Sequence, residues 1–129
     1  MNDPRIPVLA ALLAQGRLLH WTCGVLALAS WVLGPPWWLG LLVGLVFVIE
    51  SWFAARVGLD ARLFECVADG LELSQLDAGL LGLGLVGRVE ERTLAQRIDG
   101  ARRLWRTQLL LVIGQGALAV VSLVWAGVR

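Results

Sequence analysis

The residues best suited to chemistry in this 129-residue chain are a few polar side chains inside long apolar runs. Glu50 lies within the run 37–55, and Arg17 and His20 lie within an earlier run from 8 to 33. An ionised carboxylate in the centre of a bilayer costs at least about 2.5 kcal/mol unless it is protonated or paired. We therefore expect Glu50 to be protonated, or to be paired with Arg17 or His20.

These polar residues are expected to lie at a common depth. His20 is 13 residues before Leu33, where the first run ends, and Glu50 is 13 residues after Trp37, where the second begins. At 1.5 Å per residue, both side chains lie about 20 Å along the helix from the connecting turn. Arg17 lies one turn deeper, and two glutamines of the third run bracket this level. The sequence thus predicts an intramembrane polar cluster on the bundle interior, made of Arg17, His20, Glu50, Gln108 and Gln115.

Three apolar helices are expected to position this cluster. The chain is 58% hydrophobic, well above the roughly 45–50% of soluble domains. The runs 10–33, 37–55 and 108–127 are long enough to cross a hydrocarbon core of about 30 Å. Gly34, Pro35 and Pro36 end the first helix, because proline lacks the backbone donor. We predict an all-α fold, with residues 1–129 forming one integral membrane domain, a three-helix bundle.

The second and third helices are expected to extend beyond the membrane. After residue 55 the apolar positions keep a helical period while charged residues appear between them, and from Arg88 a helical pattern continues into the third span. This pattern predicts that residues 56–107 form a helical hairpin on one side of the bilayer. Within it, Ser74 is a candidate N-cap and four glycines interrupt a leucine-rich run. The stretch 74–87 is either a short interfacial helix or a flexible turn.

The arginine distribution predicts the orientation. The segment between the second and third spans holds eight arginines, whereas the turn at 34–36 holds none. The positive-inside rule therefore places the hairpin and the N-terminus in the cytoplasm and the C-terminus in the periplasm, in a bacterial inner membrane. Tryptophans are expected at both interfaces, the outer set being Trp31, Trp37, Trp38 and Trp125 and the inner set Trp52 and Trp105.

Small residues along the spans are candidates for close helix packing, because they let two backbones approach. The predicted packing positions are Gly24, Gly40, Gly44 and Ser51. The GxxxG pair at Gly40 and Gly44 serves either packing within the bundle or dimerisation. A purely structural interpretation also applies to the polar cluster, which then only marks where three helices meet.

The expected hairpin carries opposite charges on its two arms. Glu65, Asp69 and Glu72 form an acidic face on the first arm, and the second arm is rich in arginine. In one interpretation the charges of the two arms neutralise each other or are solvated, with little effect on stability. In the other, the arms form a docking platform for a partner or for anionic headgroups. The predicted docking residues are Leu80, Leu81, Leu83, Arg102, Arg103 and Arg106.

The sequence contains no recognisable catalytic pattern and no metal-ligand spacing. A net charge of +1 gives no signature of nucleic-acid binding. We therefore expect a non-enzymatic accessory, assembly or scaffold subunit of a larger membrane complex, without metal or cofactor. Its contacts would be the lipid bilayer and another membrane protein or further copies of itself. Two alternatives stay open, a homo-oligomeric transporter or channel using Glu50 and His20, and a redox subunit that binds haem or quinone.

Overall fold

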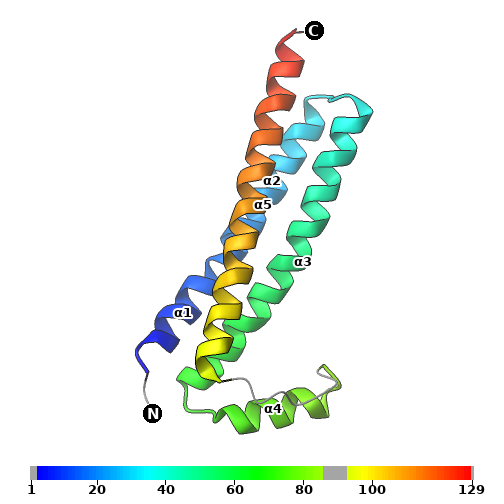
Figure 1. Ribbon diagram of the computed structural model, residues 1–129. Coiled ribbons are helices and arrows are strands. Elements are labelled where there is room, and N and C mark those ends of the chain that lie inside the picture. Colours follow the sequence, from blue (N-terminus) through cyan, green and yellow to red (C-terminus); the bar gives the residue numbers. More distant parts are fainter. Residues whose placement is uncertain (1–2, 86–92, 129) are drawn as a thin grey trace.

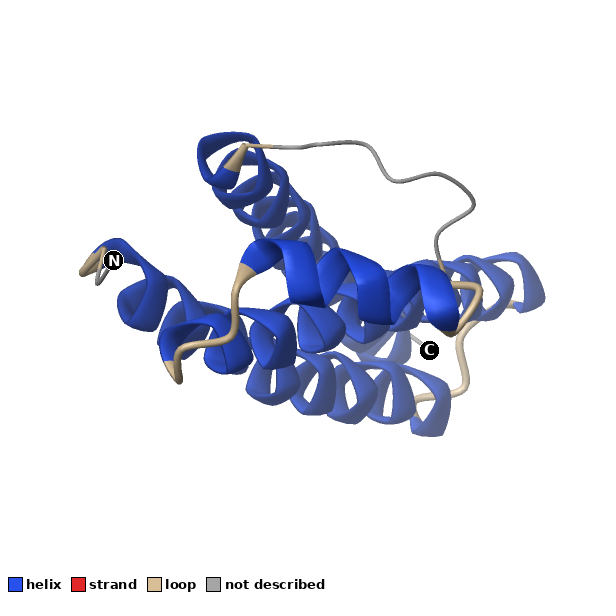
Figure 2. Ribbon diagram, turned by 90° about the horizontal axis from the view of Figure 1, so that it is seen from below, coloured by secondary structure: helices blue, strands red, loops and turns tan. Residues whose placement is uncertain are grey.

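The computed structural model describes residues 3–85 and 93–128, and all regular secondary structure in these ranges is α-helical. The helices are α1 (Arg5–Ala14), α2 (Gly16–Val32), α3 (Trp37–Ala68), α4 (Leu73–Gly82) and α5 (Leu94–Val128). In Figure 1, α2, α3 and α5 run side by side, α1 continues the line of α2, and α4 lies across the far end of α3. Figure 2, viewed from that end, shows α4 crossing the bundle.

Three helical stretches are long and apolar enough to cross a membrane, namely Arg5–Val32, Trp37–Ala68 and Leu94–Val128. Their outward surfaces carry large apolar side chains that are more than 60% exposed, such as Trp21, Val25 and Leu110. An exterior of this kind is suited to lipid. These three helices indicate a multi-pass membrane protein, and the all-α class of the predicted fold is confirmed.

The first span is interrupted at Gln15. The Gln15 N–H bonds to the Leu12 carbonyl, a contact of 3₁₀ type, and regular α-helix resumes at Gly16. The expected single helix is therefore two segments in nearly one line. Glycines with positive φ follow α2, α3 and α4 at Gly34, Gly70 and Gly84, the position where a residue without a Cβ most readily turns the chain out of a helix.

The short helix α4 resolves the alternatives left open for the stretch 74–87. Residues 73–82 are helical, and residues 86–92 lie outside the described ranges. The N-cap is Glu72 rather than Ser74, because the Glu72 N–H donates to Gln75 Oε1 at 3.4 Å as part of a capping box. Ser74 instead lies inside the first turn, so its prediction as N-cap was wrong.

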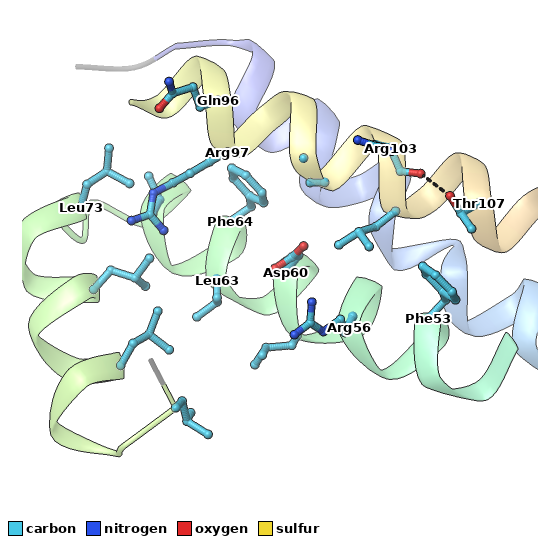
Figure 3. Close-up of a pocket in the computed structure, with 18 residues that line it drawn as sticks. Phe53, Arg56, Asp60, Leu63, Phe64, Leu73, Gln96, Arg97, Arg103 and Thr107 are labelled. Carbon is cyan, nitrogen blue, oxygen red and sulfur yellow. Dashed lines mark hydrogen bonds between the residues drawn. The ribbon is translucent and has the colours of Figure 1, made fainter. Parts of the chain in front are cut away.

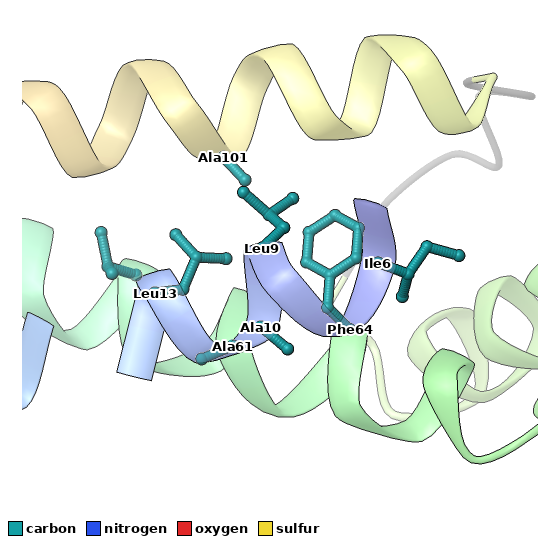
Figure 4. Close-up of a cluster of buried hydrophobic side chains, with 8 residues drawn as sticks. Ile6, Leu9, Ala10, Leu13, Ala61, Phe64 and Ala101 are labelled. Atoms are coloured by element: carbon teal, nitrogen blue, oxygen red, sulfur yellow. The ribbon is translucent and has the colours of Figure 1, made fainter. Parts of the chain in front are cut away.

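The interior of the bundle is apolar in one half and contains buried polar groups in the other. Beside α4, α1 packs against α3 and α5 through an apolar core (Figure 4) made of Ile6, Leu9, Ala10, Leu13, Val57, Ala61, Phe64 and Ala101. In the other half the interior is rich in polar groups, the fully buried ones being Ser30, Glu50, Gln108, Gln115 and Ser122. The part of the bundle expected to hold two helices therefore contains a third, because α1 packs there against α3 and α5.

Candidate functional site

Glu50 is the centre of a hydrogen-bonded network that joins all three spans. Its carboxylate is fully buried on α3. One oxygen, Oε2, lies 2.8 Å from Nδ1 of His20 on α2, and the other, Oε1, accepts a hydrogen bond of 2.9 Å from Nε2 of Gln108 on α5. Both oxygens are therefore engaged, each by a different helix, and the acid is held without contact with lipid.

Gln108 extends the network to a backbone carbonyl. Its Nε2 also donates to the Gly16 carbonyl oxygen at 2.9 Å, so both amide hydrogens are used. This contact needs a glycine, because a Cβ at Gly16 would lie 2.8 Å from Val57 Cγ1 and 2.9 Å from Gln108 Oε1. At Gly16 the backbone of α2 thus lies too close to α3 and α5 for a larger residue. It was not among the predicted packing residues.

His20 connects this buried network to the bundle surface. Its side chain is 36% exposed, whereas that of Glu50 is not exposed at all. The imidazole ring stacks on Phe47 of α3 with ring centroids 5.7 Å apart and an interplanar angle of 16°. The ring is thus fixed in orientation by one hydrogen bond and one aromatic contact. The pair can hold a proton between a buried carboxylate and a half-exposed imidazole.

A seven-residue spacing explains why these side chains meet. Positions seven apart lie on one face of a helix in a left-handed bundle, and here three such series are buried. They are Leu9, Gly16, Cys23 and Ser30 in α1 and α2, then Val43, Glu50, Val57 and Phe64 in α3, and Ala101, Gln108, Gln115 and Ser122 in α5. Glu50 and Gln108 thus occupy equivalent interior positions on facing helices.

Two members of the predicted polar cluster behave differently from Glu50. Arg17 is exposed on α2 and, among the described residues, takes part in no hydrogen bond or ion pair with Glu50. Its long side chain is free to reach toward headgroups. Gln115 is fully buried two turns from Gln108, and neither of its amide atoms has a partner among the described residues. The structure therefore brings together His20, Glu50 and Gln108, with Gln115 separate and Arg17 outside.

The predicted packing residues lie beside the interior rather than at its centre. A Cβ at Gly24 would be 3.6 Å from Phe47, and one at Gly44 would be 3.8 Å from Trp31, both ordinary contacts. A Cβ at Gly40 would lie 3.9 Å from Pro35 Cγ, which is an ordinary contact too. The Ser51 hydroxyl donates to the Phe47 carbonyl of its own helix, and therefore does not bridge two helices.

The predicted docking residues are divided between two environments. Leu80 lines a cavity between α4 and the bundle, whereas Leu81 and Leu83 are 46% and 74% exposed. Arg102, Arg103 and Arg106 are all exposed on α5. The acidic residues Glu65, Asp69 and Glu72 are exposed too. The ion pair that joins α4 to α5 is instead Arg97 with Asp77.

The chemistry available at the site is that of a buried acid and a single imidazole. Among residues 3–85 and 93–128, no group of three His, Cys, Asp or Glu side chains is placed to hold a metal ion. Comparison with protein-family models, with curated proteins and with solved structures gives no match for this chain.

Proposed function

We propose that this protein is a non-enzymatic accessory or assembly subunit of a larger membrane complex, in which the Glu50 network is structural. The observation that supports this most is the engagement of both Glu50 oxygens by two different helices. A carboxylate that carries an ion through a membrane needs a free oxygen facing a water-filled path. Here the acid instead fastens α3 to α2 and α5.

The surfaces left for a partner lie mainly at the end that carries α4. The exposed leucines 81 and 83 stand there, and the exposed acidic side chains of Glu65 and Asp69 are at the end of α3. Exposed leucines beside acidic side chains suit a partner that presents apolar and basic groups to them, while the exposed arginines of α5 stand apart on another helix. By the positive-inside rule, the protein lies in a bacterial inner membrane with this end on the cytoplasmic side. Trp37 and Trp38, both exposed, then mark the opposite interface.

Native mass spectrometry of the protein extracted from its own membranes in mild detergent tests this function. We expect a second polypeptide at fixed stoichiometry. Leu81→Asn combined with Leu83→Asn should remove that polypeptide, and Leu71→Asn, at an exposed leucine outside the docking set, should retain it. A protein that appears alone in all these preparations would contradict the proposal.

A second candidate, a homo-oligomeric transporter or channel, is favoured by the exposure of His20. An imidazole that is 36% exposed at membrane depth and bonded to Glu50 offers a proton route to the bundle surface, where another copy could complete it. In the same experiment this candidate predicts a pure homo-oligomer. His20→Phe would then abolish proton flux into liposomes without dissociating the oligomer.

A further inference from the structure

A cavity of about 630 Å³ lies between α4 and the adjoining parts of α3 and α5. Figure 3 shows its lining residues, with Phe53 and Phe64 on α3 and Leu73 on α4. Its walls are mainly apolar, and leucines of three helices contribute to them, including Leu63, Leu76 and Leu104. The cavity is thus an apolar space at the end of the spans, covered by a helix that makes few contacts with the others.

The charged groups of the lining are predominantly cationic. Arg56, Arg97 and Arg103 line the cavity, against one carboxylate, Asp60. Arg97 pairs with Asp77 of α4 through one terminal nitrogen, and its buried Nε has no hydrogen-bond partner among the described residues. Arg56 lies over the Trp52 ring, 5.6 Å from its centroid, a ring type that favours the membrane interface. The lining therefore combines an apolar wall with three arginines, which outnumber the two carboxylates beside them, Asp60 in the lining and Asp77 in the ion pair.

We propose that this cavity binds one anionic phospholipid, with its phosphate near Arg56 and Arg103 and part of an acyl chain against the leucines of α3 and α4. The volume is within the range of small-molecule sites and too small for a partner helix, which is 10–12 Å wide with its side chains. Guanidinium groups bind phosphate in a forked geometry, and basic pockets between membrane helices bind acidic headgroups. The site does not depend on the proposed subunit function.

Lipid titration of the purified protein in detergent, followed by native mass spectrometry, tests the site. The probes are phosphatidylglycerol and phosphatidylcholine with identical chains. We expect one phosphatidylglycerol to bind at least fivefold more tightly than phosphatidylcholine. Arg103→Gln should weaken phosphatidylglycerol binding about fivefold, the effect of roughly one interfacial arginine. Its matched control is Arg102→Gln, because Arg102 is the adjacent exposed residue and does not line the cavity.

Filling the cavity tests the acyl-chain part of the site. Gly100 lines the cavity, and a Cβ there would meet no atom within 4 Å, so Gly100→Leu occupies the space without a steric clash at its base. It should weaken lipid binding at least fivefold. Gly58→Leu, at an equally open glycine outside the cavity, should leave it unchanged. Equal binding by both leucine variants, or complete competition by millimolar inorganic phosphate, would overturn the proposal.

Discussion

Replacing Gly16 with alanine is the sharpest test of how the three spans meet. The added methyl group would lie 2.8 Å from Val57 Cγ1 and 2.9 Å from Gln108 Oε1. Real Cβ atoms do not approach that closely, so at least one neighbour must move. Movement of Gln108 breaks its hydrogen bonds to both the Gly16 carbonyl and Glu50, which are the links of α5 to α2 and α3.

The expected loss of stability follows from three terms. Overpacking of an interior costs about 1–3 kcal/mol. An interhelical hydrogen bond in a membrane protein contributes about 0.6 kcal/mol and at most about 1.7 kcal/mol. The higher helix propensity of alanine offsets up to about 1 kcal/mol. Together these give a net destabilisation of about 1–3 kcal/mol for Gly16→Ala.

Reversible unfolding in mixed micelles, followed by circular dichroism, measures this difference. Gly114→Ala is the control, because a Cβ at Gly114 on α5 would meet no atom within 4 Å, and it should be neutral or slightly stabilising. Adding Val57→Ala to Gly16→Ala removes one clash, so the double variant should be more stable than the sum of the two single effects. Gly16→Ala as stable as the wild type, or no more destabilised than Gly114→Ala, would refute the reasoning.

Three further predictions concern buried and terminal polar groups. Glu50→Leu should destabilise the bundle by about 1–3 kcal/mol, because the groups bonded to Glu50 lose their acceptor, while Glu50→Gln should cost less than half as much in the same unfolding assay. Gln115→Leu should be neutral or stabilising by about 1 kcal/mol, since it removes a buried amide that has no partner among the described residues; clear destabilisation would reveal a partner. Hydrogen bonds from Arg5 hold the pKa of the Asp3 carboxyl below its usual range, so the stability that Asp3 gives the start of α1 should persist above its usual pKa and be lost only as pH falls through the lowered value. An NMR titration of the Asp3 side chain should show that low midpoint, and Arg5→Gln should raise it.

The sequence predicted the helical fold and offered His20, beside Arg17, as a partner for Glu50, because both predictions rest on strong local signals. Apolar runs of 19 residues or more leave few alternatives to a membrane helix, and equal distances from one tight turn place His20 and Glu50 level with each other. Arg17 was misassigned because depth alone does not specify a helix face. It lies three residues before His20, yet its side chain is on the exposed surface of α2.

The predicted packing positions lie beside the most buried residues for a similar physical reason. Gly40, Gly44 and Ser51 are each one residue after Leu39, Val43 and Glu50, which are the buried positions. Small residue size was taken as the signal, whereas a seven-residue spacing specifies the interior here. That spacing was present in the sequence, and it would have identified Gly16 through its distance of seven from Leu9 and Cys23. The contacts of α4 depend on tertiary packing and have no comparable local signal.

The seven-residue series pass from the apolar half of the interior into the polar half, and this gives the polar layer a specific physical role. In the half beside α4, the interior is made of apolar residues such as Phe64 and Ala101. Between helices in lipid, apolar contacts bring no hydrophobic gain, because lipid tails are as apolar as the side chains. A helix with a repeating interior could then shift by seven residues at little cost. The hydrogen bonds of Glu50 to His20 and Gln108 oppose such a shift, because any other register leaves a buried carboxylate unpaired, just as one buried asparagine sets the register of a coiled coil.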